Sequence, residues 1–263
     1  MLTKIQSFLP EGHLWQNQII WYDEITSTND VAKDLIHQGA PHGTVLIADR
    51  QSGGRGRMGR SFVSPAGQGV YMSVILRFPN TPEQLMHLTC AAAVAACDAV
   101  EAVTGLRPGI KWTNDLVYGG RKLAGILTEL VIAPTQTAAV IGIGINCAQA
   151  QADFPEDIRS FAGSLSMVCG KSTDRARLAA ALIEAFSKMA QSIGEKQAIL
   201  DTYRRDCVTV GKAVSVVRGD TLRHGTAVGI DDEGALLVEF SDGCKEAVNA
   251  GEVSVRGMYG YCP

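Results

Sequence analysis

Arginine and glycine residues alternate between positions 50 and 70 in a pattern that suits the binding of an anion. Residues 51–60 read QSGGRGRMGR, and positions 50–70 contain four arginines and no acidic residue. Glycine lets the backbone come close to a ligand, and arginine binds phosphate or carboxylate through paired hydrogen bonds. Because Arg55, Arg57 and Arg60 would repel one another without a counter-anion, we expect this segment, the Gly/Arg loop (residues 50–69), to order over an anionic ligand.

Two other interpretations of the Gly/Arg loop compete with ligand binding. For an arbitrary loop of this composition, an exposed, solvated segment is the more common outcome. Residues 54–59 (GRGRMG) also match the G-x-G-x-x-G pattern of dinucleotide-binding folds. That motif requires a helix directly after the glycines. Because residues 61–69 contain Pro65, Gly67 and Gly69, we do not expect a dinucleotide site here.

A second group of chemically capable residues lies between positions 111 and 129, which read KWTNDLVYGGRKLAGILTE. Two short strands around the Gly-Gly turn would bring Asn114, Asp115 and Lys122 close together. A lysine at the end of a sheet attracts phosphate or carboxylate, and Asp115 with Asn114 suits a hydrated Mg²⁺ that substrate phosphates also bind. Taken alone, an Asn-Asp turn followed by a solubilising lysine is the simpler explanation.

Two glycines interrupt an apolar segment that ends with Gly142-Ile-Gly144-Ile-Asn146. Glycine inside a strand often marks the close approach of a ligand or of another backbone. A sterically crowded sheet explains these glycines equally well.

Hydrophobic patterns predict the elements that must position these groups. Short β-prone runs indicate strands at residues 19–22, 44–48, 70–77, 110–112, 116–118, 122–132 and 138–146. Amphipathic or capped stretches indicate helices at residues 29–38, from a Thr81-Pro82 start to 103, at 174–191 and at 195–206.

The character of the chain changes after Gly211. Four β-prone runs, at residues 213–218, 221–230, 235–240 and 244–248, are separated by short turn sequences. An all-β unit of about 50 residues is marginal alone, so it should dock on the rest of the chain. We therefore predict an α+β fold: a mixed β-sheet with flanking helices in residues 1–209, followed by a small C-terminal β-barrel in residues 210–263.

The composition excludes several classes of protein. Hydrophobic residues make up 46% of the 263 positions and charged residues 19%, so the chain can build a core. The net charge of −3 disfavours nucleic acid as the main partner. No run approaches the roughly 18 apolar residues of a membrane span, and residues 1–12 lack a secretion signal. We expect a cytoplasmic protein with no membrane partner.

Cysteine and histidine spacing argues against a metal centre built by the protein alone. The seven cysteines form no C-x-x-C pair, and the five histidines form no H-x-x-x-H pair. We expect Cys90, Cys97 and Cys147 to be reduced core thiols.

Five motifs stand in one order along the chain: TSTN at 26–29, the Gly/Arg loop, KWxND at 111–115, RKLAGI at 121–126 and GxGIN at 142–146. This combination resembles the biotin–protein ligase family, whose catalytic fold is related to class II synthetases. The resemblance covers residues 20–146 and resumes at 229–239 and 251–256. Residues 147–210 match the family only in general character.

The resemblance implies a role for each matching residue. It implies that biotin contacts Ser27, Thr28, Asn29, Gln51, Arg55, Gly56, Arg57, Lys122, Gly125, Gly142 and Gly144. It implies that ATP contacts Arg57, Trp112, Asn114, Asp115, Lys122, Asn146 and Arg256. Among these, Lys122, Arg57 and Arg55 would be catalytic, and Asp115 would bind Mg²⁺.

The resemblance also implies an activity, which is ATP- and Mg²⁺-dependent biotinylation of a lysine on a biotin carboxyl carrier protein, a subunit of acetyl-CoA carboxylase. The intermediate would be biotinyl-5′-AMP. Family members occur as monomers or as ligand-promoted dimers, so a ligand-dependent homodimer stays open. Three alternatives remain: an acyl ligase for lipoate or octanoate, a non-catalytic biotin sensor, and a nucleic-acid-binding protein.

Two features depart from the family pattern. Met58 stands where many members have a third consecutive basic position, which puts the tightness of adenylate retention in question. About 18 residues precede the first predicted strand. Some members carry a winged-helix DNA-binding domain there, so we expect neither a DNA partner nor repressor function.

Overall fold

The computed structural model describes residues 1–78, 87–132, 137–249 and 254–256, with backbone only for the last segment. Its larger sheet has seven strands in the order β1-β2-β3-β7-β6-β5-β4. β1 and β2 run parallel, and the other neighbouring strands run antiparallel. The strands are β1 (Ile19–Ile25), β2 (Thr44–Gln51), β3 (Gly69–Phe78), β4 (Gly109–Lys111), β5 (Asp115–Tyr118), β6 (Arg121–Ile132) and β7 (Thr137–Asn146).

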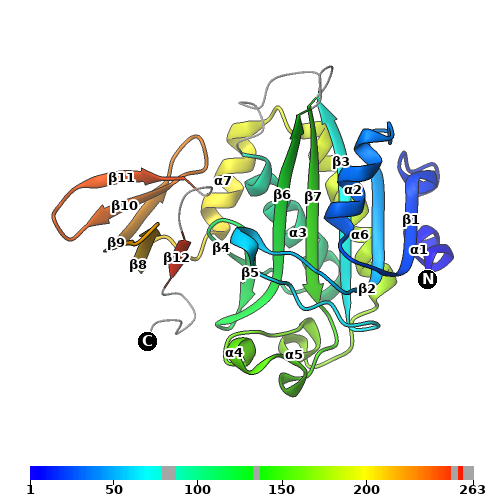
Figure 1. Ribbon diagram of the computed structural model, residues 1–263, viewed down its shortest axis with the longest axis horizontal. Coiled ribbons are helices and arrows are strands. Elements are labelled where there is room, and N and C mark those ends of the chain that lie inside the picture. Colours follow the sequence, from blue (N-terminus) through cyan, green and yellow to red (C-terminus); the bar gives the residue numbers. More distant parts are fainter. Residues whose placement is uncertain (79–86, 133–136, 250–253, 257–263) are drawn as a thin grey trace.

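Helices cover both faces of this sheet (Figure 1). On one face, Ala32 and Ile36 of α2 pack with Leu46, Ile75 and Val140 from the strands. On the other face, apolar residues of α3 and α6 join the main core with residues of β3, β6 and β7. The long helices are α2 (Thr28–His37), α3 (Leu88–Thr104), α6 (Arg175–Ser192) and α7 (Lys196–Asp206), and α1 (Leu2–Phe8) packs on α6.

Each strand predicted in residues 19–146 is present within a few residues of its expected position. The expected helix start at Thr81-Pro82 lies outside the described residues. Between β7 and α6 the chain forms short elements that no sequence pattern predicted: η4 (Gln151–Asp153), α4 (Glu156–Arg159) and α5 (Leu165–Cys169). The mixed sheet with flanking helices confirms the predicted fold class.

The C-terminal part is a separate antiparallel sheet with the strand order β11-β10-β9-β8-β12. Its strands are β8 (Ala213–Arg218), β9 (Thr221–Ile230), β10 (Leu236–Phe240), β11 (Lys245–Val248) and β12 (Ser254–Arg256). In Figure 1 it lies beside α7 and β4. The indole nitrogen of Trp112 donates a hydrogen bond to the Gly234 carbonyl at 3.0 Å, so this sheet docks directly on the larger unit. The boundary between residues 209 and 210 falls between α7 and β8 and stays a prediction.

The cysteines that the structure describes are free thiols, as the sequence predicted for the core. All cysteines in the described residues are free, and Cys90, Cys97 and Cys147 are buried. Burial raises the pKa of Cys90 and of Cys147 to about 12, so both thiols stay protonated near neutral pH. Among the described residues, no helix is both long enough and apolar enough to span a membrane.

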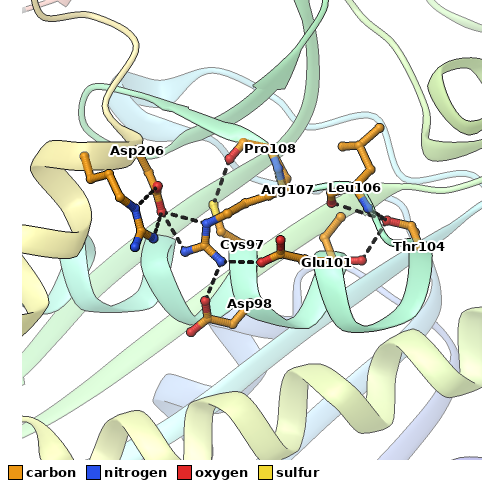
Figure 2. A network of polar contacts seen from close by, with 10 residues as sticks. Cys97, Asp98, Glu101, Thr104, Leu106, Arg107, Pro108 and Asp206 are labelled. Carbon is orange, nitrogen blue, oxygen red and sulfur yellow. Dashed lines mark hydrogen bonds and ion pairs between the residues drawn. The ribbon is translucent and has the colours of Figure 1, made fainter.

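A cluster of charges around Arg107 fixes the strand that leads into the site (Figure 2). Arg107 Nη1 donates to Asp98 and to Glu101 of α3, each at 2.7 Å. Its Nε and Nη2 donate to Asp206 at the end of α7, at 3.0 and 2.6 Å. Because Arg107 lies two residues before β4, the cluster holds the start of β4 against α3 and α7.

Replacing Arg107 by alanine should destabilise the protein by about 2–3 kcal/mol. The Asp206 side chain is only 7% exposed and would lose the less exposed of its two arginine partners. Urea unfolding would measure the change. Arg205→Ala is the matched control, because Arg205 also contacts Asp206 but is 62% exposed. Equal stability losses in the two variants would contradict this account of the cluster.

Candidate active site

One cavity of ≈ 200 Å³ collects the predicted site residues. It is bounded by the Gly/Arg loop, the start of α2, the β4–β5–β6 hairpin and the segment after β7. The predicted residues that line it are Ser27, Thr28, Asn29, Gln51, Arg55, Gly56, Arg57, Trp112, Asn114, Asp115, Lys122, Gly125, Gly142, Gly144 and Asn146. Arg256 is the remaining one. It ends β12, where its backbone pairs with Ser215, and its side chain lies outside the described part of the structure.

Gln51 joins the start of α2 to the Gly/Arg loop. Its Oε1 accepts hydrogen bonds from the Thr28 backbone N–H at 2.8 Å and from the Thr28 hydroxyl at 3.1 Å. Its Nε2 donates to the Ser64 hydroxyl at 2.9 Å. An N–H in the first turn of a helix has no partner within the helix, so Gln51 satisfies Thr28 and fixes the loop at the same time.

Asn29 is buried at the floor of the cavity with its amide fully engaged. Its Nδ2 donates to the Leu127 carbonyl at 3.2 Å and to Glu129 at 2.8 Å. Its Oδ1 accepts a hydrogen bond from Ser73 at 2.7 Å. A Cβ built on Gly142 would lie 2.0 Å from this Oδ1. The missing side chain at position 142 therefore makes room first for Asn29, and direct room for biotin stays a prediction.

Gly142→Ala should destabilise the protein by about 2–4 kcal/mol and weaken biotin binding, because the new methyl group must displace the buried Asn29 amide. Thermal unfolding with and without biotin would measure both effects. Gly229→Ala is the matched control, since a Cβ there would meet Leu237 at an ordinary 3.6 Å. A Gly142→Ala protein as stable as the control would show that Asn29 adjusts freely.

Two arginines of the Gly/Arg loop, Arg55 and Arg57, contact different parts of the protein around the cavity. Arg57 donates to the Thr113 hydroxyl at 2.9 Å and to Asn114 Oδ1 at 3.0 Å. Burial lowers the pKa of the Arg57 guanidinium from its usual value. Arg55 instead forms a close ion pair with Asp30 of α2 and is 44% exposed. Whether the order of this loop depends on a ligand stays a prediction.

The loop between β4 and β5, which carries Trp112 and Asn114, is held from behind. The Trp112 backbone N–H donates to the Thr209 hydroxyl at 2.8 Å, and the Tyr203 hydroxyl donates to the Thr113 carbonyl at 3.0 Å. Asn114 Nδ2 donates to the Ile126 carbonyl at 2.8 Å. These bonds present Thr113 and Asn114 to Arg57 as fixed oxygen acceptors.

Positive charge dominates the centre of the cavity. Lys122 Nζ lies 2.7 Å from Asp115 Oδ1, and Lys111 is buried nearby with 8% of its surface exposed. Burial lowers the pKa of Lys111 to about 8. Asp115 opposes this shift, while Lys122 and Arg60 reinforce it. Asp115 is the one carboxylate among the described lining residues, against five cationic side chains, so the cavity suits a polyanion.

An apolar wall closes the side of the cavity formed by residues 150–163. Phe154, Ile158 and Phe161 line it. The segment is joined to Lys122 by two backbone hydrogen bonds, from Lys122 N–H to the Phe161 carbonyl at 2.7 Å and from Gly163 N–H to the Lys122 carbonyl at 2.9 Å. Asn146 Nδ2 donates to the Gly163 carbonyl at 3.0 Å. An aromatic and aliphatic wall beside a polyanion site suits a flat ring.

Two family models and several characterised proteins match this chain over most of its length. The family model described as "Biotin/lipoate A/B protein ligase family" matches residues 21–146, and "Biotin protein ligase C terminal domain" matches residues 209–256. The bifunctional ligase/repressor BirA of Bacillus subtilis is 37% identical, over 88% of this chain and 72% of that protein. The biotin–[acetyl-CoA-carboxylase] ligase of Mycobacterium tuberculosis is 34% identical, over 88% and 87%.

This chain belongs to the biotin protein ligase family.

Solved structures agree with the family. The biotin protein ligase from Aquifex aeolicus in complex with biotin and ATP superposes with a TM-score of 0.77 at 29% identity, over 91% of this chain and 98% of that one. The biotin protein ligase from Leishmania major in complex with biotinyl-5-AMP has a TM-score of 0.60 at 23% identity, which shows the shared fold.

Sequence reasoning missed several lining residues of this biotin protein ligase family member. Lys111 stood inside a quoted motif but received no role, and Arg60 was considered only as one of the charges of the Gly/Arg loop. Phe62 was missed because its partners are remote in sequence: its ring lies where a Cβ on Gly144 would approach it to 2.4 Å, and 3.5 Å from such a Cβ on Gly125. The apolar wall follows β7, where the sequence showed no regular period.

Proposed function

We propose that this chain is an ATP-dependent biotin–protein ligase. It joins biotin to a lysine of a biotin carboxyl carrier protein, a subunit of acetyl-CoA carboxylase, through biotinyl-5′-AMP. The observation that carries the proposal is one cavity in which the family motifs meet, polar at the Asn29 end, cationic in the middle and apolar at the Phe161 end. That order matches the parts of a biotinyl-adenylate: a ureido ring, a phosphate and an adenine.

The first half-reaction joins two anions. A carboxylate oxygen of biotin attacks the α-phosphorus of ATP, a P–O bond forms, and pyrophosphate leaves with the electrons of the bond that breaks. Lys122, Arg57 and Lys111 lower the repulsion between the reactants and stabilise the charge that develops. Arg55 forms an ion pair with Asp30, and its proposed part in this step is to fasten the loop over the reactants.

The second half-reaction transfers the acyl group. The neutral amine of the carrier lysine attacks the acyl carbon, a C–N bond forms, AMP leaves with the electrons of the C–O bond, and the nitrogen releases one proton to solvent. The enzyme needs no nucleophile of its own, and among the described lining residues none is cysteine or histidine. The Gly/Arg loop over the cavity would keep water from the mixed anhydride. Positioning supplies much of the acceleration.

A magnesium ion fits this site only together with the nucleotide. Within the described residues, no three His, Cys, Asp or Glu side chains are grouped to hold a metal ion. Asp115 is the single carboxylate among the lining residues that the structure describes, and Mg²⁺ commonly takes one or two carboxylates plus substrate phosphates. When bound, the ion would neutralise phosphate charge. Asp115 would hold it, while Lys122 stays beside the same carboxylate.

The cytoplasm is the proposed location, since the free buried thiols suit a reducing compartment. A homodimer that forms when ligand binds, as in some members of the family, is the assembly proposed for testing. Sedimentation with and without biotin and ATP would decide it.

Transfer to the carrier tests the proposal. The chain, biotin, ATP and Mg²⁺ are incubated with a purified carrier domain, and intact-mass spectrometry follows the carrier. Addition of one biotinyl group that depends on ATP supports the ligase. Modification by lipoate or octanoate instead would favour the alternative acyl ligase. Biotin binding without any transfer or adenylate would favour a sensor.

Nucleotide binding should take up protons near pH 8 through Lys111. The pKa of Lys111 is about 8 without ligand, so roughly half of its amines are neutral at that pH. Bound phosphate favours the charged form and raises this pKa, so protons are taken up. At pH 6 Lys111 is already protonated and adds nothing. Calorimetry in buffers of different ionisation enthalpy measures the uptake, and Lys111→Gln should reduce it. An unchanged uptake at pH 8 would contradict the assignment.

A further inference from the structure

A network of five side chains joins the Gly/Arg loop to α2 and β6 beneath the Asn29 end of the cavity. Lys33 lies 2.8 Å from Asp30 and 3.1 Å from Glu129. Arg55 pairs closely with Asp30 and lies 3.8 Å from Glu129. Glu129 also accepts a hydrogen bond from Asn29 at 2.8 Å. Asp30 and Lys33 belonged to no motif, and Glu129 stood at the end of the quoted segment 111–129 without a role.

We propose that Glu129 is a positioning residue that holds both Asn29 and the Gly/Arg loop at the biotin end of the cavity. Its Oε2 orients Asn29, and its Oε1, together with Asp30, retains the cations Lys33 and Arg55. The naming of biotin as the ligand rests on the proposed function. The assignment of Glu129 rests on the geometry of the network.

The two carboxylate oxygens face different parts of the site. Oε2 meets the amide of Asn29, which is 4% exposed and holds the position over Gly142 that only a glycine permits. Oε1 meets the ammonium of Lys33, on the outward side of α2. Since Glu129 is 23% exposed, its charge is only partly screened by solvent.

Asp30 alone would be left to hold two cations if Glu129 lost its charge. Hydrogen bonds from Lys33 and from Arg55 lower the pKa of Asp30, although burial by itself would raise it. Both cations therefore already depend on this carboxylate. With one anion for two cations, Arg55 would be held less firmly, and with it the loop.

The loop has a second attachment, two residues after Arg55, to a different segment of the protein. Arg57 binds Thr113 and Asn114, which lie on the nucleotide side of the cavity. Loosening Arg55 should therefore open the biotin end while the nucleotide end keeps its contacts. This separation distinguishes a positioning role for Glu129 from a general structural one.

The test is Glu129→Gln in the full chain, with biotin as the probe. The amide keeps an oxygen for Asn29 but replaces the oxygen that faces the cations. We expect biotin dissociation to be about tenfold faster. The KM for ATP and the thermal midpoint should stay unchanged. In an Arg55→Ala background the same substitution should add little, because the two residues act as one unit. Glu239→Gln, which loses a surface pair with Lys245, is the matched control.

Each outcome decides the inference. Faster biotin dissociation with an unchanged KM for ATP, and without additivity to Arg55→Ala, supports it. An unchanged biotin dissociation rate, or an equal weakening of biotin and ATP binding, overturns the role of Glu129. In that case the proposed function still stands if the wild-type protein catalyses biotin-dependent exchange of pyrophosphate into ATP. Wild-type protein that neither binds biotin nor forms adenylate would overturn the function itself. If Glu129→Gln does not fold, Glu129→Asp, which keeps the charge but shortens the reach to Lys33 and Arg55, tests the same contacts by the biotin dissociation rate.

Discussion

Lys122→Ala should slow formation of biotinyl-adenylate by about two to three orders of magnitude. The Lys122 ammonium lines the cationic centre of the cavity and is held by Asp115 at 2.7 Å, close to where carboxylate and phosphate must meet. Its charge matters more as the reaction proceeds than in the bound substrates, so the loss should fall mainly on kcat. Single-turnover measurement of adenylate, with saturating biotin and ATP, gives the rate directly.

Lys188→Ala is the matched control for this variant. Lys188 pairs with Glu184 on the surface of α6, is 73% exposed and does not line the cavity. Adenylation at the wild-type rate in Lys122→Ala would remove this lysine from the mechanism. A loss of biotin affinity with an unchanged kcat would assign it to ground-state binding instead.

Arg57→Ala should reduce adenylation by about two orders of magnitude and also accelerate release of the adenylate. The reason is that Arg57 serves two purposes. It brings positive charge to the phosphate region, and its bonds to Thr113 and Asn114 fasten the Gly/Arg loop across the cavity. Arg57→Lys should recover only part of the activity, since an ammonium cannot reproduce the forked guanidinium. Rapid filtration of labelled adenylate measures the release rate.

Arg50→Ala is a control from the same loop. Arg50 pairs with Glu24 at 3.2 Å, is 54% exposed and lies outside the cavity lining. If Arg57→Ala and Arg50→Ala changed adenylation and adenylate release equally, the loop would act through its overall charge. The hydrogen bonds of Arg57 to Thr113 and Asn114 would then not contribute.

The pattern of apolar residues predicted the large sheet well, because its strands carry their own signal. β3, β6 and β7 are long and rich in β-forming residues, and they pair along nearly their whole length. The elements between β7 and α6 were not predicted, since they are short and are held by contacts to other segments, such as the bonds between Lys122 and residues 161 and 163.

The candidate site was predicted as a list of residues but not as a set of partnerships. Sequence motifs gave Arg55 and Arg57 the same catalytic role and, of the two, assigned ATP to Arg57 alone, but they named no protein partner for either side chain. The structure turns Arg55 toward Asp30 and Arg57 toward Asn114. Such partners lie 25 and 57 residues away in the chain and become visible only when the loop is folded over the sheet. Glu129 was missed for the same reason.

The most direct measurement is the exchange of labelled pyrophosphate into ATP by the wild-type chain, with Mg²⁺ and without a carrier. The proposed function predicts exchange, because formation of biotinyl-adenylate from biotin and ATP is reversible at this site. The exchange should require biotin, and lipoate should not replace it. No exchange by folded protein that still binds biotin would contradict the claim that this cavity forms an adenylate.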